Sequence, residues 1–457
     1  MTEYSLFISG FFIFILVIPF LSFIYKFIRS PKKERTKYFH DKEERILFFH
    51  GVNICNSSKW AIDNLPWHKL EDYKKLKKHG FNLARFLIYW EAFEPEKGKY
   101  NLNYIRKVKE HIAILNDLGI SVILDVHQDL YNGKFLGNGF PNWTLPKEKY
   151  PFKAKKIWYK NYLQKAVRKS YEHFWGSISL KKSYTNMLMH LQEQFINVPN
   201  IIGIDVMNEP FPTLPRFFEF EKKVLAEFYQ YIELTRSLKS YRIPFFYEPA
   251  IWGSTGIPSL LIKNVYTHWR NFIPHYYPPF CHDIGTYNII DKWLMKLAIK
   301  SKAREAQIIK SPFIIGEFGL SASIKNKVNS INDFSNLADK YHMSWLWWSY
   351  DKEEHSAYGL LDTNGNPNAT MKELTRAYPQ KIAGLNPVFH NNKNTFYIEY
   401  TCDTSSIFST DIFIPGKVCS ITTNTTHTSE DTYTDGILQF YQKIPGKQII
   451  EIVWQHS

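Results

Sequence analysis

Two glutamates follow apolar runs that are typical of buried strands. Residues 201–207 lead into Asn208 and Glu209, and residues 312–316 lead into Glu317. In a parallel β/α barrel the carboxyl ends of the strands meet at one face, where catalysis occurs. Two carboxylates there can flank a glycosidic bond, one as the acid and one as the nucleophile. Each motif alone also fits an ordinary turn, so it is the pair that indicates glycoside hydrolysis.

Other polar and aromatic side chains follow further strand-like runs and would collect at the same face. The candidates are Arg85, His127, Asp129, Asn208, His275, Tyr277 and Trp347, with Trp348 as the alternative indole. An arginine beside the nucleophile would keep its carboxylate ionised. Asn208, next to the acid, is placed to hydrogen-bond a sugar 2-hydroxyl. The remaining side chains offer hydrogen bonds to sugar hydroxyls and a flat indole floor for a sugar ring.

The elements that would position these side chains alternate in the order of a barrel. Apolar or β-branched runs are separated by segments such as 70–79 and 105–118, whose apolar residues recur at helical spacing. The strand candidates are 46–52, 81–88, 121–126, 201–207, 243–247, 265–268 or nearby, 312–316 and 343–348. Eight alternating units predict an α/β fold, a (β/α)8 TIM barrel over residues 46–380. The longest insertion, from 130 to about 196, would lie over the active face.

The pattern changes in the last part of the chain. Short alternating runs separated by polar turns follow, at 395–400, 406–414, 417–422, 436–441 and 448–454. They predict a small antiparallel β-sandwich domain over residues 381–457. A chain of 457 residues is longer than one hydrophobic core usually serves, which agrees with one large domain and one smaller domain.

The N-terminal segment predicts a membrane anchor over residues 1–28. Residues 4–25 carry no charge and are long enough to span a bilayer as a transmembrane helix, and a basic linker follows over residues 29–45. Glu3 stands where a cleaved signal peptide would usually be basic, so a single-pass N-terminal anchor is preferred to a secreted protein. The Lys and Arg residues that follow the apolar run favour a catalytic part on the cytosolic side of the membrane. Four Asn-X-Ser/Thr tripeptides, which are glycosylation acceptor patterns, favour the lumenal side, so the side of the membrane stays open.

Composition narrows the function classes. The formal net charge is +14, yet the sequence contains no zinc-ligand spacing, glycine-rich phosphate loop or basic recognition helix, so no nucleic-acid partner is expected. We interpret the excess of positive charge as a solvated basic surface. The alternative is a surface that attracts anionic lipid headgroups. The four cysteines have no CxxC spacing, and we expect neither a metal nor a cofactor. Whether Cys402 and Cys419 pair is left open.

Several longer strings add specificity to these motifs. They are GFNLAR from residue 80, WEAFEP from 90, LDVHQD from 124, GFPNW from 139 and YEP from 247, beside NEP at 208, GEFG at 316 and HYY at 275. Together with Arg85 and His127, the set resembles the retaining family 5 glycoside hydrolases, and the longer strings resemble their endoglycoceramidase branch. The resemblance runs from about residue 48 to residue 378.

The resemblance implies roles for individual residues. Glu209 corresponds to the acid/base and Glu317 to the nucleophile, and Lys59, Asp129 and Asn208 correspond to contacts with the first sugars. Lys59 lies in a segment that departs from the usual context of the branch. The implied reaction is cleavage of the β-glycosidic bond between sugar and ceramide in a glycosphingolipid. No cofactor and no obligatory protein partner are implied, and a membrane anchor would suit a glycolipid substrate.

Three alternatives remain open at this level. The same chemistry could act on glucosylceramide, on a steryl glucoside, or on a β-glucan or mannan. A non-catalytic membrane-bound lectin is a second alternative, which the presence of both glutamates disfavours. Glu248 is a third, because it also ends a strand-like run and could serve as the acid.

Overall fold

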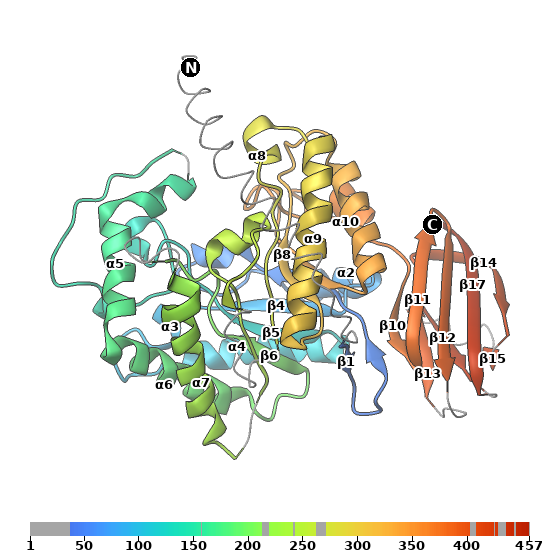
Figure 1. Ribbon diagram of the computed structural model, residues 1–457, viewed down its shortest axis with the longest axis horizontal. Helices are drawn as coiled ribbons and strands as arrows, with labels where there is room; N and C mark the ends of the chain where they lie inside the picture. The colour runs from blue at the N-terminus through green and yellow to red at the C-terminus, as the bar shows by residue number, and fades with distance from the viewer. Residues whose placement is uncertain are drawn as a thin grey trace.

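The computed structural model describes most of the chain (Figure 1). The described ranges are 37–156, 158–212, 219–240, 243–261, 271–402, 408–424, 426–427, 436–442 and 445–456. The predicted anchor over residues 1–28 and the strand candidate at 265–268 lie outside these ranges.

A curled parallel sheet forms the centre of the larger part. Its strands are β3 (His50–Ile54), β4 (Leu83–Ile88), β5 (Ser121–Val126), β6 (Ile201–Asp205), β7 (Phe245–Phe246), β8 (Ile314–Phe318) and β9 (Ser344–Trp347). They pair in the order β7-β6-β5-β4-β3-β9-β8, and every pairing within this sheet is parallel. Nearly all their residues are buried, as expected for a parallel sheet covered on both faces. Seven of the eight strand candidates are confirmed here with shifted ends, and the candidate at 265–268 stays a prediction.

The segment 271–276 lies between the two outermost strands. Tyr247, after β7, donates its backbone N–H to Asn271 at 3.0 Å and accepts from Ile273 at 3.1 Å. Tyr276 then donates to the backbone carbonyl of Glu317 in β8 at 2.9 Å. The two edges of the sheet are thus linked through this short segment.

Helices follow the strands and cover the outside of the sheet (Figure 1). They are α2 (Leu70–Lys78), α3 (Trp90–Phe93), α4 (Leu102–Asp117), α5 (Lys165–Gly176), α6 (Ile178–Phe195), α7 (Ala226–Ser237), α8 (Cys281–Ile284), α9 (Ile289–Ile309), α10 (Lys327–Tyr341) and α11 (Ala369–Leu374). Short 3-10 or π turns occupy Asn56–Lys59, Gly133–Phe135, Asn142–Thr144, Trp158–Leu163, Phe220–Leu225 and Ile251–Thr255. Local sequence fixes several starts: Asn288 and Asp291, for example, form a capping box on α9.

Two layers of side chains fill the inner face of the sheet. The lower layer is apolar and contains Phe49, Leu83, Ile123, Phe246, Ile273, Ile314 and Leu346. Because side chains alternate along a strand, the residues two positions further on point to the same face. Those residues include Arg85, Asp125, Glu248, His275 and Trp348. Alternation thus places a charged layer directly above the apolar one, at the carboxyl ends of the strands.

Two antiparallel sheets form the smaller part. One has the order β1-β2-β10-β13-β16-β15 and the other the order β11-β12-β17-β14. Their strands are β1 (Phe39–His40), β2 (Ile46–Leu47), β10 (Tyr378–Ile382), β11 (Leu385–Asn392), β12 (Thr395–Cys402), β13 (Ser409–Phe413), β14 (Gly416–Thr423), β15 (Thr426–His427), β16 (Ile437–Tyr441) and β17 (Gly446–His456). Phe413 and Phe440 of the first sheet share one core with Phe396 and Ile450 of the second. The predicted antiparallel strands are confirmed, and β1 and β2 join them from the N-terminal side.

The expected membrane anchor requires a correction. Within the described ranges, no helix combines the length and the apolar character needed to cross a bilayer. The longest of these helices, α9, carries charged residues such as Lys296 and Lys300 along its exposed side. The single-pass membrane localisation expected from residues 1–28 is therefore not retained.

Candidate active site

Arg85 occupies the centre of the charged layer. It is fully buried, and its guanidinium donates to Glu317 at 2.6 Å, to Glu248 at 2.8 Å and to Asp205 at 2.9 Å. Its other partners are Asp125 at 2.9 Å, Asn53 at 3.0 Å and Asn208 at 3.0 Å. Burial alone would lower the pKa of Arg85, but the surrounding carboxylates raise it well above its usual value. The guanidinium is therefore a fixed positive charge that orients four acidic side chains.

Glu317 lies near the end of β8 with both carboxylate oxygens occupied. Oε1 accepts the bond from Arg85, and Oε2 accepts the phenolic O–H of Tyr277 at 2.8 Å. Its side chain is 6% exposed. Two donors thus fix the orientation of this carboxylate, as a nucleophile requires.

Glu209 has an unusual backbone for a non-glycine residue. Its φ is 35°, in the left-handed region, and its N–H donates to Glu248 at 2.9 Å. Its carbonyl accepts from the Gln128 side chain at 3.1 Å. The neighbouring bonds hold a conformation that is costly for a residue with a Cβ atom, as is frequent at functional sites. Burial raises the pKa of the Glu209 carboxyl, which favours the protonated form that a general acid requires.

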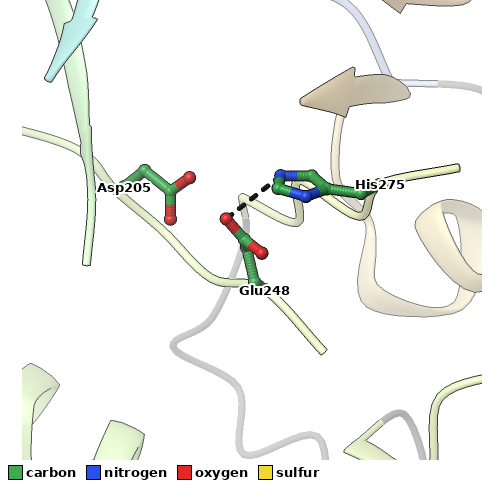
Figure 2. A group of neighbouring side chains, drawn as sticks. All are labelled: Asp205, Glu248 and His275. Atoms are coloured by element: carbon green, nitrogen blue, oxygen red, sulfur yellow. Dashed lines mark ion pairs between the residues drawn. The ribbon is translucent and has the colours of Figure 1, made fainter. Parts of the chain in front are cut away.

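His275 joins the acidic side chains. Its Nδ1 lies 3.1 Å from Glu209 Oε1 and 3.5 Å from Glu317 Oε2, and its Nε2 lies 3.2 Å from Glu248 Oε1. Figure 2 shows Glu248 directed at the imidazole, with Asp205 beside it. Burial lowers the pKa of His275, but Glu248 and Glu317 more than offset this and raise it well above its usual value. The ring is therefore a second cation within the cluster.

The two catalytic candidates are close together. One carboxylate oxygen of Glu209, one of Glu317 and a ring nitrogen of His275 all lie within 4.8 Å of one another. Retaining glycosidases place their carboxyl groups about 5–5.5 Å apart, whereas inverting enzymes need a wider gap for a water molecule. The observed spacing fits the retaining arrangement.

Two groups of side chains have the spacing of metal ligands. One group is Glu209, His275 and Glu317, and the other is Asp205, Glu248 and His275. The guanidinium of Arg85 already contacts Asp205, Glu248 and Glu317. The site thus holds a built-in cation at the place where a metal would bind.

A second group of side chains lies beside the glutamates. Lys59 Nζ is 2.6 Å from Asp129 Oδ2 and 4.1 Å from the centre of the Trp348 ring. The imidazole of His127 stacks on the same indole at 5.4 Å, and its Nε2 lies 3.2 Å from Asp129. Burial would raise the pKa of Asp129, but Lys59 and His127 hold it well below its usual range. A cation, an anion and a flat ring are thus arranged as a polar surface with one aromatic wall.

The sequence-based assignment of Trp347 requires a correction. Its ring is fully buried in the core, 5.1 Å from that of Phe318, and its Nε1 donates to the carbonyl of Tyr358 at 2.9 Å. Trp348 points to the inner face instead, beside Lys59 and His127. The alternation of side chains along β9 decides between the two indoles, because Leu346 also faces inward.

Asn208 is held on both sides. Its side-chain oxygen accepts from Arg85, and its side-chain N–H donates to the carbonyl of Gln128 at 3.1 Å. The structure therefore gathers Arg85, Asn208, Glu209, His275, Tyr277 and Glu317 into one group, with Lys59, His127 and Asp129 beside it.

Sequence reasoning missed three supporting residues, Asn53, Asp125 and Asp205, and for Glu248 it left open a rival acid or, before Pro249, a supporting role. Glu248 is 1% exposed and bonds Arg85, His275 and the Glu209 backbone, which is the position of a supporting residue. A signal for the aspartates was present: Asp125 and Asp205 interrupt strongly apolar strands, and a buried charge needs a partner.

Comparisons with known proteins agree with this chemistry. A family profile described as Cellulase (glycosyl hydrolase family 5) matches residues 48–354. An endoglycoceramidase of Hydra vulgaris is 22% identical over 397 residues, which covers 74% of this chain and 71% of the relative. Endoglycoceramidase I of Rhodococcus hoagii is 23% identical and covers 81% of this chain and 78% of the relative.

Among solved structures, endo-glycoceramidase II from Rhodococcus sp. in complex with ganglioside GM3 superposes with a TM-score of 0.83. It is 23% identical and covers 92% of this chain and 100% of that one. The site and the profile define a retaining glycosidase. The chain belongs to glycosyl hydrolase family 5.

Proposed function

We propose that this protein cleaves the β-glycosidic bond between sugar and ceramide in glycosphingolipids. The observation that carries the proposal is the close approach of Glu209 and Glu317 around His275, in a chain that resembles endoglycoceramidases along most of its length. Two of the similar Rhodococcus structures are a ganglioside GM3 complex and a lactosyl-enzyme intermediate, which supports this substrate class.

The proposed mechanism is a double displacement. Glu317 attacks the anomeric carbon while Glu209 protonates the leaving oxygen of ceramide, and a glycosyl-enzyme ester forms. Glu209, now ionised, then takes a proton from water, which attacks the same carbon and releases Glu317. Arg85 and Tyr277 orient Glu317 for the attack, and His275 lowers the pKa of Glu209.

We assign sugar binding to the neighbouring group. Lys59 and Asp129 present charged donors and acceptors to sugar hydroxyls, and the indole of Trp348 is the stacking surface. The side-chain amide of Asn208, held by Arg85 and Gln128, hydrogen-bonds the 2-hydroxyl of the reacting sugar.

We also infer that the fold is a closed (β/α)8 barrel, with the segment 271–276 in the sixth strand position. Its backbone bonds to Tyr247 and to Glu317 support this. The boundary between the two domains is placed at residue 380, with residues 46–380 catalytic and 381–457 a β-sandwich.

A second candidate substrate is glucosylceramide or a steryl glucoside. A glucosylceramidase of Rhizopus delemar is 25% identical over 40% of this chain, and the sterylglucosidase 1 structure of Cryptococcus neoformans superposes with a TM-score of 0.69. The glucosylceramidase covers less of this chain than the Hydra endoglycoceramidase does. The sterylglucosidase structure has a lower TM-score than the endo-glycoceramidase II structure.

A substrate panel separates the two candidates. Purified protein is incubated with GM3, lactosylceramide, glucosylceramide and steryl glucoside, and free ceramide, sterol and released sugar are measured by mass spectrometry. Intact oligosaccharide released from GM3 or lactosylceramide is the expected result. Release only from the single-sugar lipids would contradict the proposal and favour the alternative.

A further inference from the structure

The exposed tryptophans of the described chain share one end of the molecule. Trp60, Trp158 and Trp293 are 56%, 44% and 49% exposed, whereas the other described tryptophans are buried or partly buried. Each exposed indole belongs to a different segment that follows a strand or strand position at its carboxyl end. This is the end of the sheet that carries the active site.

Contacts tie each of these segments to the site. Trp60 directly follows Lys59, which bonds Asp129. The ring of Trp158 lies 5.5 Å from that of Tyr162, whose hydroxyl donates to Asp129 at 3.3 Å. Trp60 and Trp158 thus belong to segments that contact Asp129, and Trp293 belongs to the segment that follows Tyr277, which bonds Glu317.

Trp293 belongs to an apolar surface on the segment that follows Tyr277. The chain runs from Tyr277, which bonds Glu317, into α8 and the first turn of α9 (Figure 1). Ile284, Ile289 and Ile290 are 60%, 75% and 59% exposed there. Ile289 and Ile290 precede Trp293 by four and three residues, so their side chains share one face of the helix.

The segment around Trp158 adds positive charge. Residues 147–160 contain six lysines and one glutamate. Lys155, Lys156 and Lys160 are exposed, and none of them forms an ion pair within the described ranges. Tyr159 and Leu163 beside them are also exposed. Indoles with lysines in the same segment are typical of protein surfaces that bind at the interface of an anionic bilayer.

We propose that the catalytic end of the molecule, through Trp60, Trp158, Trp293 and the 147–160 lysines, binds peripherally to a bilayer surface that contains anionic lipids. The contact is interfacial and requires no helix that crosses the bilayer. It builds on the proposed function, because it presents the active site to a glycolipid in its own membrane. The charge complementarity between the lysine-rich segment and anionic headgroups selects a lipid surface over a protein partner.

Vesicle binding tests this surface without any substrate. The full chain is mixed with phosphatidylcholine vesicles containing phosphatidylserine, and the bound fraction is measured by sedimentation at low and high salt. The combined variant Trp60→Ser, Trp158→Ser and Trp293→Ser is expected to lower the partition coefficient about tenfold or more. Lys155→Glu with Lys156→Glu should remove most of the salt dependence.

A matched control comes from the other end of the molecule. Leu234 and Leu238 are 55% and 86% exposed near the end of α7, which leads into β7 and lies at the opposite end in Figure 1. Leu234→Ser with Leu238→Ser should leave vesicle binding unchanged. Equal losses in the control and in the tryptophan variant would overturn the proposal, as would wild-type binding by the tryptophan variant.

An environment-sensitive probe reads the orientation directly. With the exposed Cys419 replaced by Ser, a fluorophore is attached through Trp293→Cys or through Leu238→Cys. Vesicles should shift the emission of the first probe to the blue and not that of the second, whatever the apolar N-terminal run contributes to total binding. Identical responses would refute the proposed orientation.

Activity separates this inference from the proposed function. Hydrolysis of a water-soluble aryl glycoside should be equal in the wild type and the tryptophan variant, because none of the three indoles belongs to the site. Turnover of glycolipid in vesicles should fall at least about tenfold in the variant. If no glycolipid is cleaved by the wild type, the proposed function fails, while vesicle binding and probe shifts still decide the surface.

Discussion

The Nδ1 atom of His275 lies 3.1 Å from Oε1 of Glu209, so the residue proposed as the acid is paired with a buried imidazole. Burial raises the pKa of Glu209, and the charged ring lowers it. The pH range in which Glu209 keeps its proton is therefore set by the balance between these two effects.

Replacing His275 by Asn should move the alkaline limb of the pH profile. Because the ring lowers the pKa of Glu209, its removal raises that pKa and shifts the alkaline limb of kcat/KM to higher pH. The measurement is kcat/KM against pH for an aryl glycoside with a poor leaving group. An alkaline limb at lower pH, or an unmoved one, would contradict the proposed pairing.

Replacing Glu317 by Gly should abolish turnover of glycolipid, because the ester intermediate can no longer form. Added azide or formate should restore part of the rate on an activated glycoside by occupying the vacated space. Replacing Glu209 by Ala should preserve the first step for good leaving groups and stop it for ceramide. Native rates of both variants on glycolipid would refute the assignment.

The first product should keep the anomeric configuration of the substrate. One carboxylate oxygen of Glu209 and one of Glu317 lie within 4.8 Å of each other, which fits the closer spacing of retaining enzymes. Proton NMR of the sugar released in the first minutes, before mutarotation, gives the answer. An inverted anomer at the earliest time would exclude the double displacement.

Arg85 should be indispensable for stability as well as for activity. Arg85→Met leaves Asp125, Asp205, Glu248 and Glu317 buried without their cation, and the free energy of unfolding should fall by about 3–5 kcal/mol. Urea unfolding at neutral pH measures it. The matched control is Arg106→Met.

The control arginine pairs with Glu110 on the surface of α4, where both side chains are exposed. A surface pair contributes little to stability, so Arg106→Met should change the unfolding midpoint only slightly. Similar losses in both variants would show that the buried network does not stabilise the fold.

The two adjacent indoles should differ in their kinetic phenotypes. Trp348→Ala removes the stacking surface, and kcat/KM should fall by a factor of about 10. Loss of its contacts with Leu87 and Tyr89 should also lower the melting temperature. Trp347→Ala leaves a cavity beside Phe318 and should destabilise by about 3–5 kcal/mol. Kinetics and thermal melts of the pair decide the assignment, and a kinetic loss confined to Trp347→Ala would reverse it.

The sequence predicted most strands because their apolar runs are long and clearly bounded. It placed the end of one strand at Gly316, whereas β8 continues through Phe318, because the backbone bonds that extend it come from residues remote in sequence. Strand ends depend on partners, which a single run of residues does not reveal.

The catalytic pair was predictable from motif and position, but its supporting network was not. Asp205 and Glu248 meet Arg85 only once β4, β6 and the segment after β7 belong to the same curled sheet, and no local spacing encodes that contact. The choice of Trp348 over Trp347 was within reach, since period-two alternation along β9 already separates the inward from the outward indole.

The pairing of β2 with β10 joins the chain just before β3 to the chain just after α11, because Ile46 lies opposite Ile382 in one antiparallel sheet. During synthesis β2 emerges long before β10, so the edge of β2 that faces β10 stays unpaired while the strands between them are made, although β1 can pair with its other edge. Such a distant pairing is slow to form and leaves an open strand edge in the meantime. A fragment that begins at Gly51 would carry β10 without β1 and β2, and its exposed edge would be prone to aggregation.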